Sequence, residues 1–316
     1  MIVIILFIAI LLLTFFNGAN DNFKGVATVW GSNTLNYKQA LTLATITTFA
    51  GSICSYFFAA ALVKNFSGKG LVPDKIISSI NFVLSVALAA AFTVLLATKY
   101  GFPISTTHGL VGALVGAGLV ASGNSVNFEN LGKTFFLPLV LSPVIAIASS
   151  LLVYTFTKAI KTNNLYLVNA AHCISAGVVS FARGLNDTPK LVALLLICNF
   201  FSLPINFILL AVVMAIGGIL NAKKVAKTMS KKITTLNHTQ GFTANIVTGI
   251  LVIIASIFGL PVSTTHVSVG SIYGIGLVSK TNNNSEVVKI VLSWILTLPI
   301  AGLLSAIIYF IIQKLN

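Results

Sequence analysis

The sequence has few charged residues, and acidic ones are the scarcest. Of its 316 residues only 8% are charged, and the acidic residues are Asp21, Asp74, Glu129, Asp187 and Glu286. A soluble domain normally has about a quarter of its residues charged, whereas here 57% are hydrophobic. This balance excludes an ordinary soluble domain and indicates a protein that lies in lipid.

Cysteine and arginine are also scarce. The three cysteines, Cys54, Cys173 and Cys198, lie in apolar runs, at spacings that suit neither a zinc site nor a disulfide framework. The formal net charge of +14 would fit a nucleic-acid binder, but Arg183 is the only arginine among the 19 basic residues. The lysines gather at the ends of apolar runs, as in membrane proteins, so we expect a lipid bilayer and no nucleic acid as partner.

Apolar runs recur along the whole chain. Several reach the roughly 20 residues that a membrane-crossing helix needs, while the runs that begin near Leu110 and Val267 are shorter, which is typical of broken or re-entrant helices. Backbone groups in lipid must be hydrogen bonded within their own segment. We therefore predict an all-α integral membrane protein with about 10–12 transmembrane segments.

The lysines also predict an orientation. No Lys or Arg precedes Lys24, so we expect the first apolar run to be a membrane helix rather than a cleaved signal. If each half of the chain crosses five times, most lysines fall on the cytoplasmic side when the N-terminus is outside. We predict a multi-pass protein of the cell membrane, with the polar segment 221–240 as a cytoplasmic loop of amphipathic helical character.

Two motifs each occur twice in the same order. Gly18–Asp21 (Gly-Ala-Asn-Asp) returns 166 residues later as Gly184–Asp187, and Phe102–His108 returns 158 residues later as Leu260–His266. We predict two repeats, 1–162 and 163–316. An odd number of crossings in each would give them inverted topology, a plan common among secondary transporters. Glycines that also repeat, Gly112, Gly116, Gly270 and Gly274, have the small-xxx-small spacing of closely packed helices.

The first motif places a carboxylate in each half. Asp21 and Asp187 follow apolar stretches, and carboxylates within membrane segments are costly enough to indicate function. An alternative is that both are helix N-caps at the water interface. Carboxylate, carboxamide and hydroxyl oxygens suit a small hard cation, sodium or a proton, rather than a soft metal. The predicted cation ligands are Asn20, Asp21, Asn22, Asn186, Asp187 and Thr188, of which Asn22 and Thr188 are the weaker candidates.

The second motif predicts an anion site. Pro103 and Pro261 suit the first turn of a helix, and the Ser-Thr-Thr that follows would offer free N–H groups, a helix dipole and hydroxyls to an oxyanion. The predicted anion donors are Ser105, Thr106, Thr107, Ser263, Thr264 and Thr265. The alternative is that these hydroxyls bond to their own helix carbonyls. Arg183 adjoins the second Asn-Asp motif and could attract anions bidentately, but we expect it to be an interfacial anchor.

Together these motifs resemble the inorganic phosphate transporter (PiT) family of sodium- or proton-coupled symporters. The resemblance rests on both Asn-Asp motifs and both Pro-x-Ser-Thr-Thr-His elements and spans essentially the full chain, with Leu185 standing where the first copy has Ala19. It implies symport at a site between inverted repeats, and it admits a homodimer. The family's long central loop is reduced here to segment 221–240, so functions of that loop are not transferred.

We therefore hypothesise a secondary active symporter, not an enzyme, that imports phosphate by alternating access, with sodium as coupling ion and no other cofactor. Asp21 and Asp187 would also contact protonated phosphate, which near neutral pH can donate to a carboxylate, whereas sulfate cannot. The alternatives are a proton-coupled phosphate or metal-phosphate permease, a sulfate permease and, more remotely, an anion channel. A hydrolase is disfavoured by two balanced copies and no Gly-x-Ser-x-Gly elbow.

Overall fold

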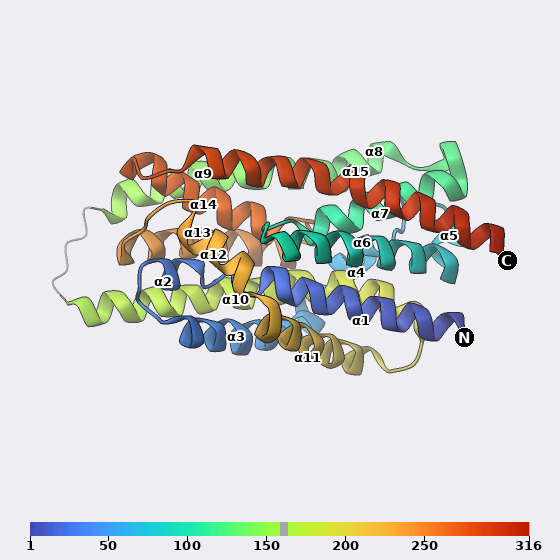
Figure 1. Ribbon diagram of the computed structural model, residues 1–316, viewed down its shortest axis with the longest axis horizontal. Helices are drawn as coiled ribbons and strands as arrows, with labels where there is room; N and C mark the ends of the chain where they lie inside the picture. The colour runs from blue at the N-terminus through green and yellow to red at the C-terminus, as the bar shows by residue number, and fades with distance from the viewer. Residues whose placement is uncertain (159–163, 316) are drawn as a thin grey trace.

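The structure is a computed structural model that describes residues 1–158 and 164–315, and the regular secondary structure of these residues is helical apart from two isolated bridges. The helices lie along one long axis and form an elongated bundle (Figure 1). The predicted all-α class is confirmed. The predicted boundary between residues 162 and 163 lies outside the described residues and stays a prediction.

The first half begins with α1 and ends with α9. Its helices are α1 (Ile2–Asp21), α2 (Ala27–Gly31), α3 (Tyr37–Phe58), α4 (Ala60–Phe66), α5 (Asp74–Ile77), α6 (Ile80–Tyr100), α7 (Thr106–Ser122), α8 (Phe128–Asn130) and α9 (Leu137–Thr157). A short 3-10 turn, η1 (Gly123–Ser125), precedes α8, and a π-helical segment, η2 (Leu131–Phe136), joins α8 to α9.

The second half repeats this order with fewer short helices. It contains α10 (Leu165–Leu195), the 3-10 turn η3 (Leu196–Cys198), α11 (Leu203–Asn221), α12 (Lys223–Lys231), α13 (His238–Ile257), α14 (Thr264–Ser279) and α15 (Asn284–Leu315). The offsets found in the sequence map α1 onto α10, α3 onto α11, α6 onto α13, α7 onto α14 and α9 onto α15.

The two halves are inverted and interlocked. In Figure 1, α1 runs inward from the N-terminus at one end of the bundle, whereas α10 enters from the opposite end. The packing of the helices follows the same internal symmetry. Within each half, α1 packs against α6 and α10 against α13, whereas between the halves α3 packs against α10 and α11 against α1. Likewise α7 packs against α15 and α14 against α9. Most major contacts of each half are therefore made with the other half.

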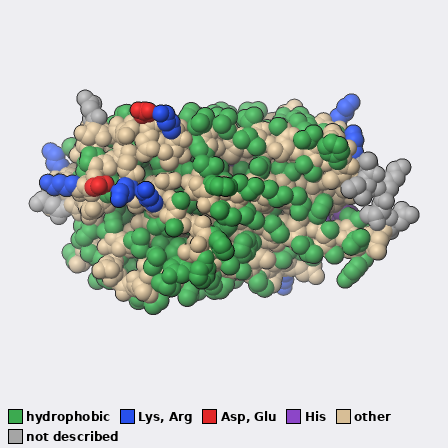
Figure 2. Space-filling model, turned by 180° about the vertical axis from the view of Figure 1, so that it is seen from behind, with side chains coloured by type: hydrophobic (Ala, Val, Ile, Leu, Met, Phe, Trp, Pro, Cys, Tyr) green, Lys and Arg blue, Asp and Glu red, His purple; other side chains and the backbone are tan. Residues whose placement is uncertain are grey.

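The outside of the bundle suits a bilayer. Eight of the described helices are long and apolar enough to cross a membrane, and α7 and α14 are the shorter helices that the short apolar runs predicted. Hydrophobic side chains cover the middle of the face in Figure 2, while most of the lysines in view lie toward its two ends. This distribution is typical of a membrane-spanning protein. Which end faces the cytoplasm stays a prediction.

The polar segment 221–240 contains α12, as its amphipathic pattern predicted. The apolar side chains of α12 are buried while its lysines are exposed. Val225 and Met229 pack in the same cluster as Ala27 of α2. The segment is thus attached to the bundle rather than extended into solvent.

Glycines bring the shorter helices close to the long ones. A Cβ on Gly112 or Gly116 of α7 would meet the backbone carbonyls of Leu298 or Gly302 in α15, and Gly270 of α14 faces the carbonyl of Pro143 in α9 in the same way. No larger residue fits this approach. The predicted packing role of these glycines is confirmed.

We predict that Gly116→Ala destabilises the protein by about 1–3 kcal/mol, because the added methyl group would collide with the backbone of α15. Gly109→Ala, on the same helix, is the matched control, since a Cβ at Gly109 has nothing within 4 Å. Thermal unfolding of both variants in one detergent measures the difference. Equal stability of the two variants would contradict the packing described here.

Candidate functional site between the two repeats

The two repeated aspartates meet in the middle of the bundle. Asp21 is the last residue of α1, whereas α10 continues through Asp187 to Leu195. Asn17 Nδ2 lies 3.5 Å from Asp21 Oδ2 and 3.4 Å from Asp187 Oδ2, so a single carboxamide touches both carboxylates. The aspartates are 2% and 3% exposed, respectively. Neither is an N-cap, and neither lies at the water interface.

Three cations neutralise these carboxylates. Lys24 donates to Asp21 Oδ1, Lys190 Nζ lies 3.2 Å from Asp187 Oδ1, and Arg183 Nε lies 3.5 Å from Asp187 Oδ2. All three cations are at most 1% exposed. The prediction that Arg183 is an interfacial anchor is wrong, because its charge is better stabilised beside buried carboxylates than by lipid headgroups. Three positive charges minus two negative ones leave one net positive charge in a buried site.

Arg183 also connects the two repeats. It occupies the position equivalent to Asn17, because 17 plus 166 is 183. Its Nη2 donates to Asn17 Oδ1 at 2.9 Å and to the Asn17 carbonyl at 3.3 Å, and its Nη1 donates to Asn22 Oδ1 at 3.3 Å. The planar guanidinium can hold several acceptors at once. It therefore fixes the end of α1 against the middle of α10.

The tips of α7 and α14 lie side by side at the same place. Thr107 donates to the carbonyl of Val262 at 3.3 Å, and Thr265 donates to the carbonyl of Ile104 at 2.8 Å. Each third hydroxyl thus reaches the segment that precedes the other repeat's Ser-Thr-Thr. Two helix N-termini pointing at one site favour negative charge there.

The serines that begin both motifs are N-caps. Ser105 Oγ accepts from the His108 backbone N–H at 3.1 Å, and Ser263 Oγ accepts from the His266 N–H at 3.3 Å. An N-cap satisfies one free helix donor, and each hydroxyl keeps its own proton to donate. The prediction of helices beginning at these motifs is confirmed.

The middle hydroxyls of the two motifs differ. Thr106 Oγ1 accepts from Asn17 Nδ2 at 3.0 Å and lies 3.5 Å from Asp21 Oδ2. Thr264 is about as buried, yet its hydroxyl has no hydrogen-bond partner among the residues that the structure describes. Buried hydroxyls normally have one. Thr264 is therefore a donor available to a bound oxyanion.

The asparagines that precede the aspartates hold neighbouring helices. Asn20 donates to Thr98 Oγ1 at 3.0 Å and accepts from the Ile104 N–H at 3.2 Å. Asn186 donates to Ser256 Oγ at 2.9 Å, and Ser256 is the repeat equivalent of Thr98. Both asparagines thus tie the motif helices to α6 and α13. Their role as cation ligands stays a prediction.

The two weaker candidates contact α3. Asn22 donates to Thr45 at 3.0 Å, and Thr188 donates to Ser52 at 2.7 Å. Both lie within one residue of an aspartate, and both are at most 1% exposed. Their role as cation ligands also stays a prediction.

Sequence reasoning did not include Asn17, Lys24 and Lys190 in the site. A signal was present, because 24 plus 166 is 190: each repeated aspartate is followed, three residues later, by lysine. A charged residue that repeats along with the motif indicates the same role in both halves. Arg183 gave no such signal, since its equivalent is Asn17.

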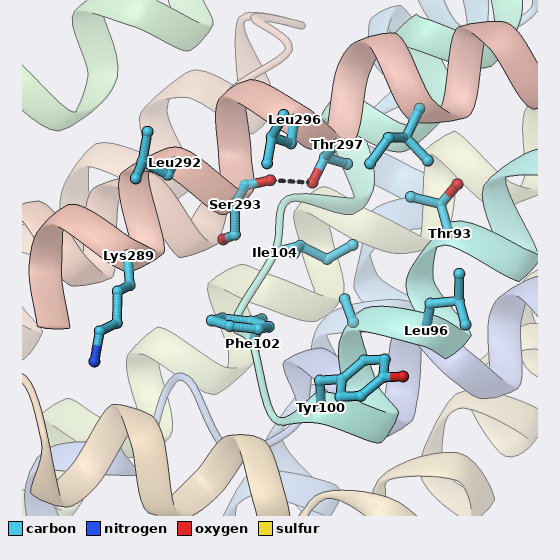
Figure 3. A pocket seen from close by; sticks show the side chains of 12 residues that line it. Thr93, Leu96, Tyr100, Phe102, Ile104, Lys289, Leu292, Ser293, Leu296 and Thr297 are labelled. Atoms are coloured by element: carbon cyan, nitrogen blue, oxygen red, sulfur yellow. Dashed lines mark hydrogen bonds between the residues drawn. The ribbon is translucent and has the colours of Figure 1, made fainter.

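A separate cavity of about 350 Å³ lies between α6 and α15. Figure 3 shows Phe102 and Ile104 pointing into it from the segment before α7, with Lys289 at one side. Three of its hydroxyl groups, those of Thr93, Ser293 and Thr297, donate to carbonyls of their own helices, and Tyr100 carries a fourth. The lining is mostly apolar, and Lys289 at its side already lies 3.4 Å from Glu286, so this cavity suits an oxyanion less well than the buried centre, which remains the candidate site.

Comparison with known proteins gives a consistent result. The sequence pattern of the phosphate transporter family matches residues 17–171 and 160–305. The chain is similar to a "Probable low-affinity inorganic phosphate transporter" of Bacillus subtilis, with 29% identity over 99% of this chain and 97% of the relative. A protein of the same description from Rhizobium meliloti is 29% identical over 94% of this chain and 92% of its own length.

A solved structure is also similar along its whole length. It is titled "The sodium-dependent phosphate transporter", with a TM-score of 0.89 and 25% identity, and the match covers 100% of both chains. The inverted, interlocked bundle described above is thus a fold that has been seen before.

We predict that Asp187→Asn lowers the free energy of unfolding by about 3–5 kcal/mol, because it leaves Lys190 and Arg183 buried beside a neutral amide. Glu129→Gln is the control: its ion pair with Lys133 is exposed, so we expect a change within about 0.5 kcal/mol. Unfolding in a fixed detergent measures both. If the two variants unfold alike, the buried charges are not balanced as described.

Proposed function

This chain belongs to the phosphate transporter family, and from that premise we propose that it carries inorganic phosphate inward across the cell membrane by alternating access. The proposed site lies between the tips of α7 and α14. Inverted halves that meet at one buried site can exchange conformations, so that the site opens first to one side and then to the other. The family and its relatives are transporters, which agrees with the prediction that the chain is not an enzyme.

The observation that most strongly supports an anion as the substrate is the excess of positive charge at the centre. Arg183, Lys24 and Lys190 exceed the two carboxylates by one charge, and all five groups are buried. A buried excess charge is costly unless a counter-charge arrives. A phosphate monoanion supplies that charge and can accept from the helix tips and hydroxyls around it.

The predicted ligands fit this proposal unequally. Thr264 offers a free hydroxyl, and Ser105 and Ser263 each retain a proton to donate. Thr107 and Thr265 already donate to carbonyls of the opposite repeat, so they would position the tips as well as contact phosphate. A protonated phosphate oxygen could donate to Asp21 or Asp187, which supports phosphate over sulfate.

Sodium is the coupling cation that the sequence predicts from the carboxylate in each repeat. The similar structure points the same way, since its title calls that protein sodium-dependent. Symport of more than one cation per phosphate would let the membrane potential assist entry.

Sodium-independent transport of phosphate is the second candidate. The observation that favours it is that Asp21 and Asp187 already pair with lysines of the same chain.

We expect purified protein in proteoliposomes to take up radiolabelled phosphate with saturation, more strongly than sulfate. Sodium and pH gradients imposed separately identify the driving ion. Empty liposomes are the control. The single variants Asp21→Asn and Asp187→Asn should both transport poorly, because each changes the charge of the site. Absence of saturable phosphate uptake by folded protein under every gradient would reject the proposed function.

We predict that Thr264→Val, which removes the free hydroxyl but conserves shape, lowers phosphate uptake about tenfold, since a hydrogen bond to a charged group is lost. Thr297→Val is the matched control, because that hydroxyl bonds to Ser293 of its own helix in the cavity of Figure 3. Initial uptake rates at low phosphate measure the effect. Equal rates in the two variants would place phosphate elsewhere.

A further inference from the structure

The two buried lysines are equivalent by the internal repeat. Lys24 follows Asp21 by three residues, and Lys190 follows Asp187 by three. Both side chains are 1% exposed, at the centre of a protein whose other lysines are mostly at its surface. Two such costly positions at matching places indicate a shared role.

The ammonium group of Lys24 is surrounded by oxygen acceptors. It donates to Asp21 Oδ1, to the carbonyl of Ile104 at 2.7 Å and to Thr265 Oγ1. These are a carboxylate of its own repeat, a main-chain carbonyl before the first Ser-Thr-Thr, and a hydroxyl from the opposite repeat. All three protons of the ammonium group are used.

Lys190 has the matching environment. It lies 3.2 Å from Asp187 Oδ1, 3.1 Å from the carbonyl of Val262 and 2.8 Å from Thr107 Oγ1, and it also donates to Asn186 Oδ1. Val262 and Thr107 are the repeat equivalents of Ile104 and Thr265. The two ammonium groups therefore occupy sites related by the internal symmetry.

A carboxylate, a main-chain carbonyl and a hydroxyl are also what a hard cation such as sodium takes as ligands. Here those oxygens are hydrogen bonded to a cation that is covalently part of the chain. A sodium ion at Asp21 or Asp187 would need the same atoms and would lie beside a buried ammonium group of like charge. The residues present do not fit sodium at these carboxylates.

The charge balance of the site also argues against sodium at these carboxylates. Lys24 and Lys190 cancel the two aspartates, and Arg183 leaves a single positive charge for one bound anion. No mobile cation is required to balance a phosphate monoanion at this site. In a chain without these lysines, two free cations would have to do so.

We propose that the ammonium groups of Lys24 and Lys190 act as tethered cations in place of two sodium ions, so that this chain moves phosphate without needing sodium. This inference rests on the proposed function and specifies the coupling at that site. It distinguishes the chain from a similar structure whose title names sodium dependence.

The decisive experiment uses the unmodified protein in proteoliposomes. We expect the initial rate of phosphate uptake to change by less than about twofold when external sodium is replaced by N-methylglucamine, and we expect phosphate not to stimulate entry of radioactive sodium. A fall of about tenfold without sodium, or sodium entry driven by phosphate, would overturn the proposal. It would leave phosphate transport itself in place.

Two variants test the lysines directly. Lys24→Ala and Lys190→Ala free the oxygens, so we expect uptake to fall about tenfold in sodium-free medium and to recover partly when sodium is added. Lys133→Ala is the matched control, because Lys133 also pairs with a carboxylate but is exposed, and its uptake should be unchanged with or without sodium. Lysine variants that transport normally without sodium would contradict the proposal.

The outcomes separate the two proposals. If the unmodified protein takes up no phosphate under any gradient, the proposed function fails. If it takes up phosphate only with sodium, the proposed function stands and the tethered cations are rejected. The measurements on the unmodified protein decide this even if an alanine variant does not fold.

Discussion

The structure depends on holding five charged groups together, two carboxylates among three cations, where each is at most 3% exposed. Asp21 and Asp187 would be prohibitively costly at the centre of a membrane bundle on their own, and so would Lys24, Lys190 and Arg183. Each is tolerated because its charge has a partner nearby, Lys24 for Asp21 and, within α10, Lys190 and Arg183 for Asp187. Oxygens of other elements, those of Thr265, Thr107 and Asn17, accept further protons of these cations. The ends of α1, α7 and α14 and the middle of α10 must therefore converge for these oxygens to reach the cations.

The repeat was visible in the sequence, and with it most of the architecture. Repeated Asn-Asp and Pro-x-Ser-Thr-Thr motifs identified the helices that meet, and the short apolar runs identified α7 and α14 as shorter than the other membrane helices. These features depend on local composition and spacing, which a sequence displays directly. The small-xxx-small glycines were interpreted correctly for the same reason.

The contacts of the charged side chains at the centre could not be predicted as well as the arrangement of the helices. Arg183 and the lysines have long flexible side chains, so their positions relative to the motif do not reveal whether they extend toward lipid headgroups or into the core. Arg183 turns inward because Asn17 and Asn22, far away in sequence, accept its protons. Such contacts follow from the way the repeats interlock, and only the folded chain specifies them.

The interlocking also bears on how the protein is made. Because α3 packs against α10 and α7 against α15, the first half reaches the bilayer before its main partner helices have left the ribosome. Its Asp21–Lys24 pair can form at once, but Arg183, Asp187 and Thr265, which complete the site, are added only with the second half. Biogenesis of this chain thus has an obligatory late step, in which α15 closes over a half that has been present since the beginning of translation.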